Sequence, residues 1–118
     1  MGRLTTHVLD TMHGCPAAGL RVTLHALADD GGATLLRTVV LDADGRAGGP
    51  LLADGDFVPG RYRLVFELAD YFRARGAELP EPPFLDRVPV DFGIADAAAH
   101  YHVPLLASPW SYSTYRGS

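Results

Sequence analysis

Short segments in which apolar and polar residues alternate fill most of the chain, and turn-forming residues separate them. The alternation is clearest over residues 61–68, where Tyr62, Leu64 and Phe66 share one side. Because successive side chains of a strand point to opposite faces, this pattern predicts a half-buried β-strand. The same reasoning predicts further strands over residues 4–10, 20–28, 34–41, 84–93, 98–107 and 110–116, and a short one near Arg46.

Turn residues and one helical segment complete this pattern. Turns are predicted at residues 13–16, 29–32 and 42–45, where glycine, proline and aspartate gather. Residues 69–75 suit a short helix, and it ends at Gly76, the residue type favoured just beyond a helix C-terminus. Pro89 places its strand at a sheet edge or a bulge, because proline cannot donate a ladder hydrogen bond.

The length and the number of elements together predict the fold class. A chain of 118 residues is long enough to bury a core, so we expect a single domain over residues 1–118. About eight strands and one short helix predict an all-β sandwich of two packed sheets. The composition is ordinary for a soluble globular protein, with 47% hydrophobic and 20% charged residues.

Charge and cysteine content exclude several classes of function. The net charge is −4 and the arginines are scattered, so we expect no nucleic-acid surface. No apolar stretch is long enough to span a bilayer, and the first residues lack the apolar core of a signal peptide. Cys15 is the only cysteine, so no internal disulfide can form. We therefore expect a cytoplasmic protein without membrane contacts.

Strand parity shows where chemistry could lie. In the first strand one side carries Leu4, Thr6 and Val8, and the other carries Thr5, His7 and Leu9. In the strand over residues 98–107, Tyr101, Val103 and Leu105 form a core face, and the opposite face holds His100, His102, Pro104 and Leu106. A sandwich needs only one face of each sheet for its core. Polar, titratable groups therefore lie on faces that packing does not use.

Taken alone, these residues do not identify a function. A single strand histidine such as His7 is more often a surface residue than a catalyst, and the same holds for His13 and His25. His100 and His102 are two residues apart and could bind one metal ion, but no cysteine or carboxylate at ligand spacing supports them. We therefore predict no metal site.

Two terminal motifs and an internal turn resemble a known family. Residues 4–10 (LTTHVLD) with 14–17 (GCPA), residues 100–106 (HYHVPLL) with 108–114 (SPWSYST), and the final YRGS are similar to the signatures of the 5-hydroxyisourate hydrolases, the transthyretin-related enzymes of urate breakdown. Residues 44–46 (DGR) resemble the arginine turn of that family. The match covers essentially the whole chain, and Trp110 departs mildly from the tyrosine of many members.

The resemblance implies a transthyretin-like sandwich that assembles as a homotetramer. Dimers would pair through edge strands, and two dimers would meet face to face around a channel. It also implies the site residues, which are His7, Arg46, His102, Tyr115, Arg116 and Ser118.

The implied reaction is hydrolysis of 5-hydroxyisourate to 2-oxo-4-hydroxy-4-carboxy-5-ureidoimidazoline in urate (purine) catabolism. His7 and His102 would share the proton transfers, because histidine titrates near neutral pH. Arg46 would stabilise the oxyanion, Tyr115 and Arg116 would bind the substrate, and Ser118 would join the catalytic network. No cofactor is required. The main alternative is a non-catalytic carrier of small aromatic ligands, as transthyretin itself is.

Overall fold

The computed structural model describes residues 2–117, which form nine strands, one α-helix and one 3-10 turn. The strands are β1 (Arg3–Asp10), β2 (Cys15–Pro16), β3 (Arg21–Leu27), β4 (Ala33–Val40), β5 (Leu52–Ala53), β6 (Gly60–Glu67), β7 (Arg87–Ile94), β8 (His100–Ala107) and β9 (Tyr112–Thr114). The 3-10 turn is η1 (Asp54–Asp56), and α1 (Leu68–Ala74) follows β6. The expected all-β class, with its single short helix, is confirmed.

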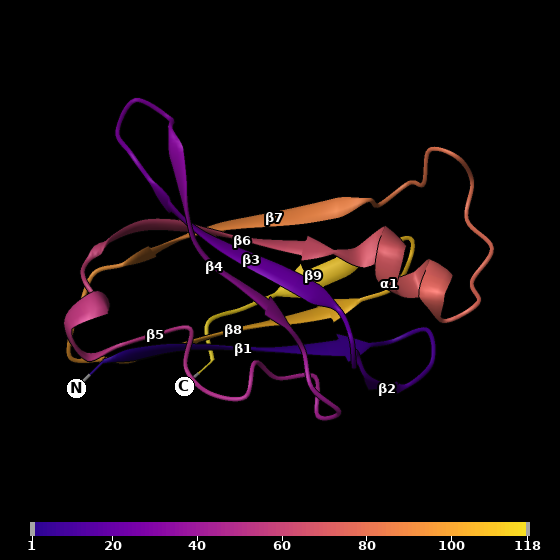
Figure 1. The fold of residues 1–118 in the computed structure, drawn as a ribbon, viewed down its shortest axis with the longest axis horizontal. Coiled ribbons are helices and arrows are strands. Elements are labelled where there is room, and N and C mark those ends of the chain that lie inside the picture. The colour runs from indigo at the N-terminus through magenta and orange to yellow at the C-terminus, as the bar shows by residue number, and fades with distance from the viewer. Residues whose placement is uncertain (1, 118) are drawn as a thin grey trace.

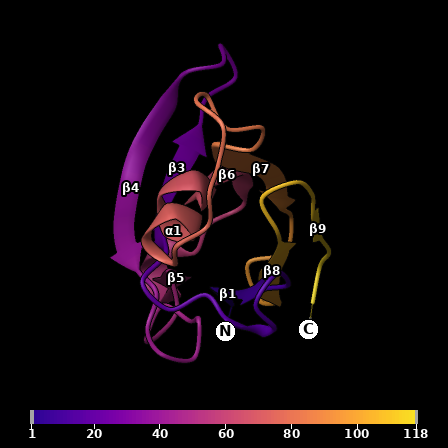
Figure 2. The same ribbon diagram turned by 90° about the vertical axis from the view of Figure 1, so that its right-hand side faces the viewer.

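The strands form two sheets that pack face to face (Figures 1 and 2). The first sheet has the order β2-β1-β8-β9, and β5 pairs with the beginning of β1. The second sheet has the order β4-β3-β6-β7. Both chain ends lie at the same side of the molecule, next to the first sheet (Figure 1). The first sheet therefore contains both of the terminal segments on which the family resemblance rests.

The core lies between the two sheets and is built by the predicted alternation. Leu4, Val8 and Leu105 point inward from the first sheet, and Leu64 and Phe66 point inward from the second. All five are fully buried. Burial of one large apolar side chain contributes about 1.5–3 kcal/mol to the free energy of folding. A one-residue shift of a strand would expose these side chains, so their burial determines which face of each strand points outward.

Helix α1 covers one end of the sandwich. It ends as predicted, because Gly76 has φ of 89° and the Ala77 amide donates to the Phe72 carbonyl at 3.0 Å. Tyr71 of α1 also donates a hydrogen bond, at 2.8 Å, to the fully buried carboxylate of Asp10 at the end of β1. The helix and β1 are therefore joined by a polar contact as well as by packing.

Several expected strands have other bounds in the structure, and those expected over 98–107 and 110–116 are the shorter β8 and β9. The strand expected over residues 84–93 begins only at Arg87, because the proline-containing connector extends further than predicted. The short strand expected near Arg46 is a single bridge between Arg46 and His7. Pro89 lies in β7, which is an edge strand as predicted. Among residues 2–117, no helix is long and apolar enough to cross a membrane.

The pairing of β1 with β8 could not be read from the pattern. The turn spacing is typical of antiparallel sheets, yet β1 and β8 pair in parallel over eight residues. Strands β2 and β5 have two residues each, which is too short for any periodicity. Parallel pairing of β1 with β8 is the feature that brings the two ends of the sequence together.

Candidate active site

The parallel register of β1 and β8 places the polar faces of both strands side by side. Thr5 lies opposite His102, and Arg3 lies opposite His100. Burial follows the predicted parity except at Pro104, which is buried although it was placed with the histidines: Leu4, Thr6, Val8, Tyr101, Val103 and Leu105 are buried, whereas Thr5, His7, His100 and His102 are half-buried. Four side chains that can take part in proton transfer thus gather on the outer face of the first sheet.

A tight turn brings Arg46 to the same face. The carboxylate of Asp42 accepts hydrogen bonds from the amides of Asp44 at 2.9 Å and Arg46 at 3.1 Å. The Val8 amide donates to the Gly45 carbonyl at 3.0 Å, which fixes the turn against β1. Gly45 has φ of 71°, and a β-carbon there would lie 2.6 Å from the Val8 oxygen. Only glycine fits this approach, so Arg46 is held next to His7.

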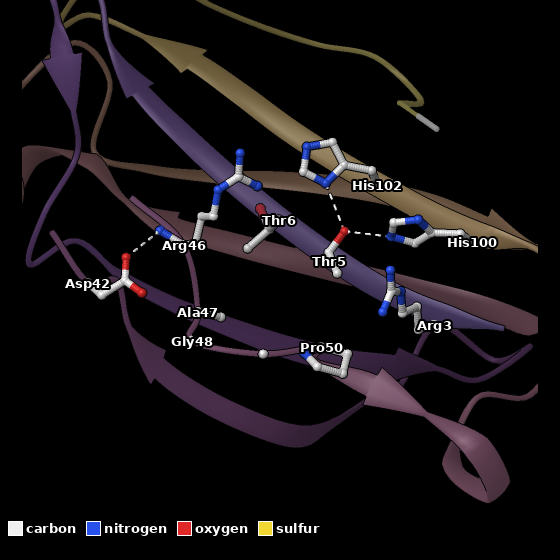
Figure 3. Close-up of a pocket in the computed structure, with 11 residues that line it drawn as sticks. Arg3, Thr5, Thr6, Asp42, Arg46, Ala47, Gly48, Pro50, His100 and His102 are labelled. Atoms are coloured by element: carbon white, nitrogen blue, oxygen red, sulfur yellow. Dashed lines mark hydrogen bonds between the residues drawn. The ribbon is translucent and has the colours of Figure 1, made fainter. Parts of the chain in front are cut away.

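A single threonine connects the two histidines of β8 (Figure 3). The Thr5 hydroxyl is 2.8 Å from Nδ1 of His102 and 2.9 Å from Nε2 of His100. Because Nδ1 of His102 contacts Thr5, Nε2 is the nitrogen of that ring that is left to meet water or a substrate. Thr5 therefore orients the imidazole of His102, one of the two histidines predicted from the sequence to be catalytic.

These residues border a pocket of about 470 Å³ on the outer face. Its walls come from β1, β8 and the segment over residues 42–50, and its lining is Arg3, Thr5, Thr6, Asp42, Arg46, Ala47, Gly48, Gly49, Pro50, His100 and His102 (Figure 3). His7 is not among the lining residues, but it lies beside Arg46 through their bridge. The pocket is large enough for a small heterocycle and is lined by cationic and hydrogen-bonding groups.

The C-terminal tail and the histidine pair line a second pocket, with a volume of about 660 Å³. The Gly117 amide donates to the His102 carbonyl at 2.7 Å, and Tyr115 and Arg116 line this pocket together with His100 and His102. The Arg116 guanidinium lies 4.1 Å from the centre of the Tyr101 ring. Ser118, a predicted catalytic residue, lies outside the described residues.

The electrostatics of the site favour neutral histidines. Burial lowers the pKa of His7, and the Arg46 guanidinium lowers it further. Burial likewise lowers the pKa of His102, with added repulsion from Arg46, His100 and His7. Both imidazoles are therefore uncharged at neutral pH, which is the form that can accept a proton.

The structure brings together most of the residues singled out in the sequence. His7, Arg46 and His102 come from three separate segments and meet at one face, and Tyr115 and Arg116 approach from the tail. Sequence reasoning missed Thr5 and Asp42. Asp42 could have been found from its position in a turn, four residues before Arg46. Thr5 could have been found because it shares a strand face with His7. Within residues 2–117, no group of three or more His, Cys, Asp or Glu side chains is placed to hold a metal ion.

Comparison with known proteins places this geometry in a family. The model of the HIUase/Transthyretin family matches residues 4–117. The chain belongs to this family. A relative from Pseudomonas aeruginosa, named 5-hydroxyisourate hydrolase, is 57% identical over 118 residues, which are 100% of this chain and 93% of the relative.

Solved structures of the HIUase/Transthyretin fold agree with this assignment. A crystal structure of (S)-allantoin synthase matches with a TM-score of 0.93 and 50% identity, and covers 99% of this chain but 44% of that longer chain. The chain therefore spans less than half the length of that protein. Sea bream transthyretin, solved in complex with thyroxine, matches with a TM-score of 0.86 and 31% identity over 98% of this chain and 94% of its own.

Proposed function

We propose that this protein is a hydrolase that opens 5-hydroxyisourate to 2-oxo-4-hydroxy-4-carboxy-5-ureidoimidazoline, a step of urate (purine) catabolism. The observation that carries the proposal is the convergence of His7, Arg46 and His102 on one face, next to a pocket of about 470 Å³. The name of the Pseudomonas aeruginosa relative, at 57% identity over the whole chain, supports the same substrate.

The proposed reaction breaks a cyclic amide C–N bond. A neutral histidine, His7 or His102, takes a proton from water as the water oxygen attacks the ring carbonyl. The Arg46 guanidinium then stabilises the negative oxygen of the tetrahedral intermediate, since its charge is permanent and its donors are fixed. As the C–N bond breaks, the proton is returned to the ring nitrogen. No metal or organic cofactor takes part in this scheme.

The tail contributes substrate binding in this proposal. Tyr115 is exposed and lines the second pocket, where its hydroxyl can reach a polar heterocycle. Arg116 lines the same pocket and is proposed to bind the substrate, with its guanidinium held against Tyr101. Ser118 is proposed to join the catalytic network through its hydroxyl. Together these residues would cover the side of the substrate away from Arg46.

The alternative function is that of a carrier for small aromatic ligands. The similarity to transthyretin in complex with thyroxine favours this class. Against it, the outer face here holds two neutral histidines and an arginine within electrostatic reach of one another. A carrier of apolar rings gains little from such groups, because desolvating them on binding costs free energy.

An ultraviolet assay separates the two functions. Freshly generated 5-hydroxyisourate is mixed with the protein, and its absorbance decay is compared with the spontaneous rate. We expect decay at least about 100-fold faster, the lower range for positioned acid–base catalysis. Decay at the spontaneous rate would contradict the hydrolase proposal. If the protein also bound an aromatic ligand saturably, the carrier function would be supported.

Two further properties belong to this proposal. We propose a homotetramer in which edge strands pair within dimers and the outer faces of the first sheets meet between dimers. We also propose a cytoplasmic location. Cys15 is the only cysteine in the sequence, so the fold needs no disulfide and no oxidising compartment.

A further inference from the structure

The Thr5 hydroxyl limits the protonation states that His100 and His102 can adopt together. It contacts Nε2 of one ring at 2.9 Å and Nδ1 of the other at 2.8 Å, and it has one proton to donate. At most one of these two nitrogens can accept that proton. For both hydrogen bonds to exist, at least one of the two rings must carry its own proton on the nitrogen that faces Thr5.

From this geometry we propose that Thr5 is a positioning residue that couples the tautomers of His100 and His102 and relays protons between them. The proposal rests on the function given above, in which His102 exchanges protons with water and substrate. His100 would be the solvent end of the relay, since it is half-exposed and lines both pockets. His102 would be the substrate end, through Nε2.

The relay conserves protons at each step. When Nε2 of His102 takes a proton from the attacking water, the Nδ1 proton of His102 moves to the Thr5 oxygen. The hydroxyl proton of Thr5 moves to Nε2 of His100, and His100 releases its Nδ1 proton to solvent. The same movements in reverse supply the proton that the ring nitrogen takes up when the C–N bond breaks.

The positive charges around His102 favour moving its extra proton to another group. Burial lowers the pKa of His102, and repulsion from Arg46, His100 and His7 lowers it further, so an imidazolium at that position is unfavourable. Arg3 lies opposite His100 on β1, Arg116 donates to the His100 carbonyl at 3.4 Å, and Asp42 is the carboxylate that lines the pocket. In this largely cationic setting, passing the proton on lets His102 act as a base without remaining charged.

A magnetic resonance experiment tests the coupling without any substrate. Long-range ¹⁵N–¹H spectra report which nitrogen of each imidazole carries the proton. We expect Nδ1 of His102 and Nε2 of His100 to differ in protonation in the natural protein, and Thr5→Val to change at least one of them. Thr23→Val is the matched control, because it removes a hydroxyl 3.0 Å from Nε2 of His25 outside the site. Identical spectra for Thr5→Val and the natural protein would overturn the coupling.

Kinetics test the relay itself. Thr5→Val should lower kcat about 10- to 100-fold with little change in KM, whereas Thr5→Ser, which keeps a hydroxyl, should restore most of it. His100→Ala should make kcat rise with the concentration of a small imidazole buffer, which replaces the missing proton acceptor. The natural protein and Thr23→Val should not respond to the buffer.

The outcomes separate the relay from the proposed function. If the natural protein accelerates the decay of 5-hydroxyisourate but Thr5→Val and His100→Ala retain its kcat and show no buffer response, the relay is wrong and the enzyme assignment stands. If the natural protein itself gives no acceleration, both proposals fall.

Discussion

At the scale of single residues, the site depends on histidines that stay neutral while an arginine stays charged. His7 and His102 are half-buried on the outer face, and Arg46 is close enough to lower the pKa of both. A buried carboxylate partner would have had the opposite effect, because it favours the imidazolium. The choice of an arginine neighbour therefore suits general-base chemistry.

Removing either imidazole should abolish most of the turnover. We expect His7→Ala and His102→Ala each to lower kcat at least about 100-fold, since positioned acid–base groups contribute about 10²–10⁴-fold. His25→Ala is the matched control, because His25 is also a half-buried strand histidine but lies on β3 in the other sheet. The ultraviolet assay measures all three. Near-normal rates in both site variants would contradict these catalytic roles.

The pH dependence of the reaction follows from the direction of the pKa shifts. A base works only in its neutral form, and its activity is lost as the pH falls below its pKa. Because the pKa values of His7 and His102 lie below the ordinary 6.5, kcat/KM should hold down to pH 6.5 and decline at lower pH. Arg46→Gln removes a cause of the shift and should move the midpoint upward. A natural midpoint above 6.5 would contradict this account.

At the scale of elements, the 42–46 turn and the β1–β8 register decide where the functional groups lie. Within the turn, the Asp42 carboxylate accepts a hydrogen bond from the Asp44 amide. The turn is also held against β1, because the Val8 amide donates to the Gly45 carbonyl. These contacts hold the backbone of Asp44 and Gly45, the two residues just before Arg46. The position of the guanidinium therefore depends on how closely the turn approaches the strand.

Substitution of Gly45 by alanine should displace Arg46. The added β-carbon would lie 2.6 Å from the Val8 oxygen, which is backbone of β1 and cannot move without disturbing the sheet. We expect kcat/KM to fall by about tenfold or more, as for a lost transition-state hydrogen bond. Gly14→Ala is the matched control, with φ of 69° but no atom within 4 Å of the new β-carbon. Equal activity of the two variants would contradict the close-approach argument.

Much of this arrangement could be predicted from the sequence. Alternation alone assigned the buried side of β1 and β8, because one face of a strand must supply the core. It could not give the parallel pairing of these strands, which is a contact between residues about a hundred positions apart. The role of Thr5 was hidden for the same reason. Its partners His100 and His102 become neighbours only after β1 and β8 have paired.

At the scale of the whole molecule, the first sheet leaves a face with both polar and apolar groups uncovered. Leu9 and Leu106 lie opposite each other on β1 and β8 and are half-buried, on the same face as His7 and His102. Their exposed atoms are available for a contact with another copy of the chain in the proposed tetramer. The proposed tetramer would cover these leucines and enclose the pocket.

Light scattering should give a mass close to four times the 12.6 kDa of one chain. Leu106→Arg should reduce this mass about twofold, because a charge buried without a partner in the contact between outer faces costs several kcal/mol. The dimers that remain should be less active, since their pockets stay open to water.

Val58→Arg is the control for this last prediction. Val58 is 51% exposed in the connection before β6 and belongs to no strand, so an arginine there adds the same charge away from the edge strands and the outer face of the first sheet. That variant should keep the mass and the activity of the natural protein. A mass of four chains in Leu106→Arg would contradict the contact between outer faces. The pocket would then be open to solvent and not enclosed by another copy of the chain.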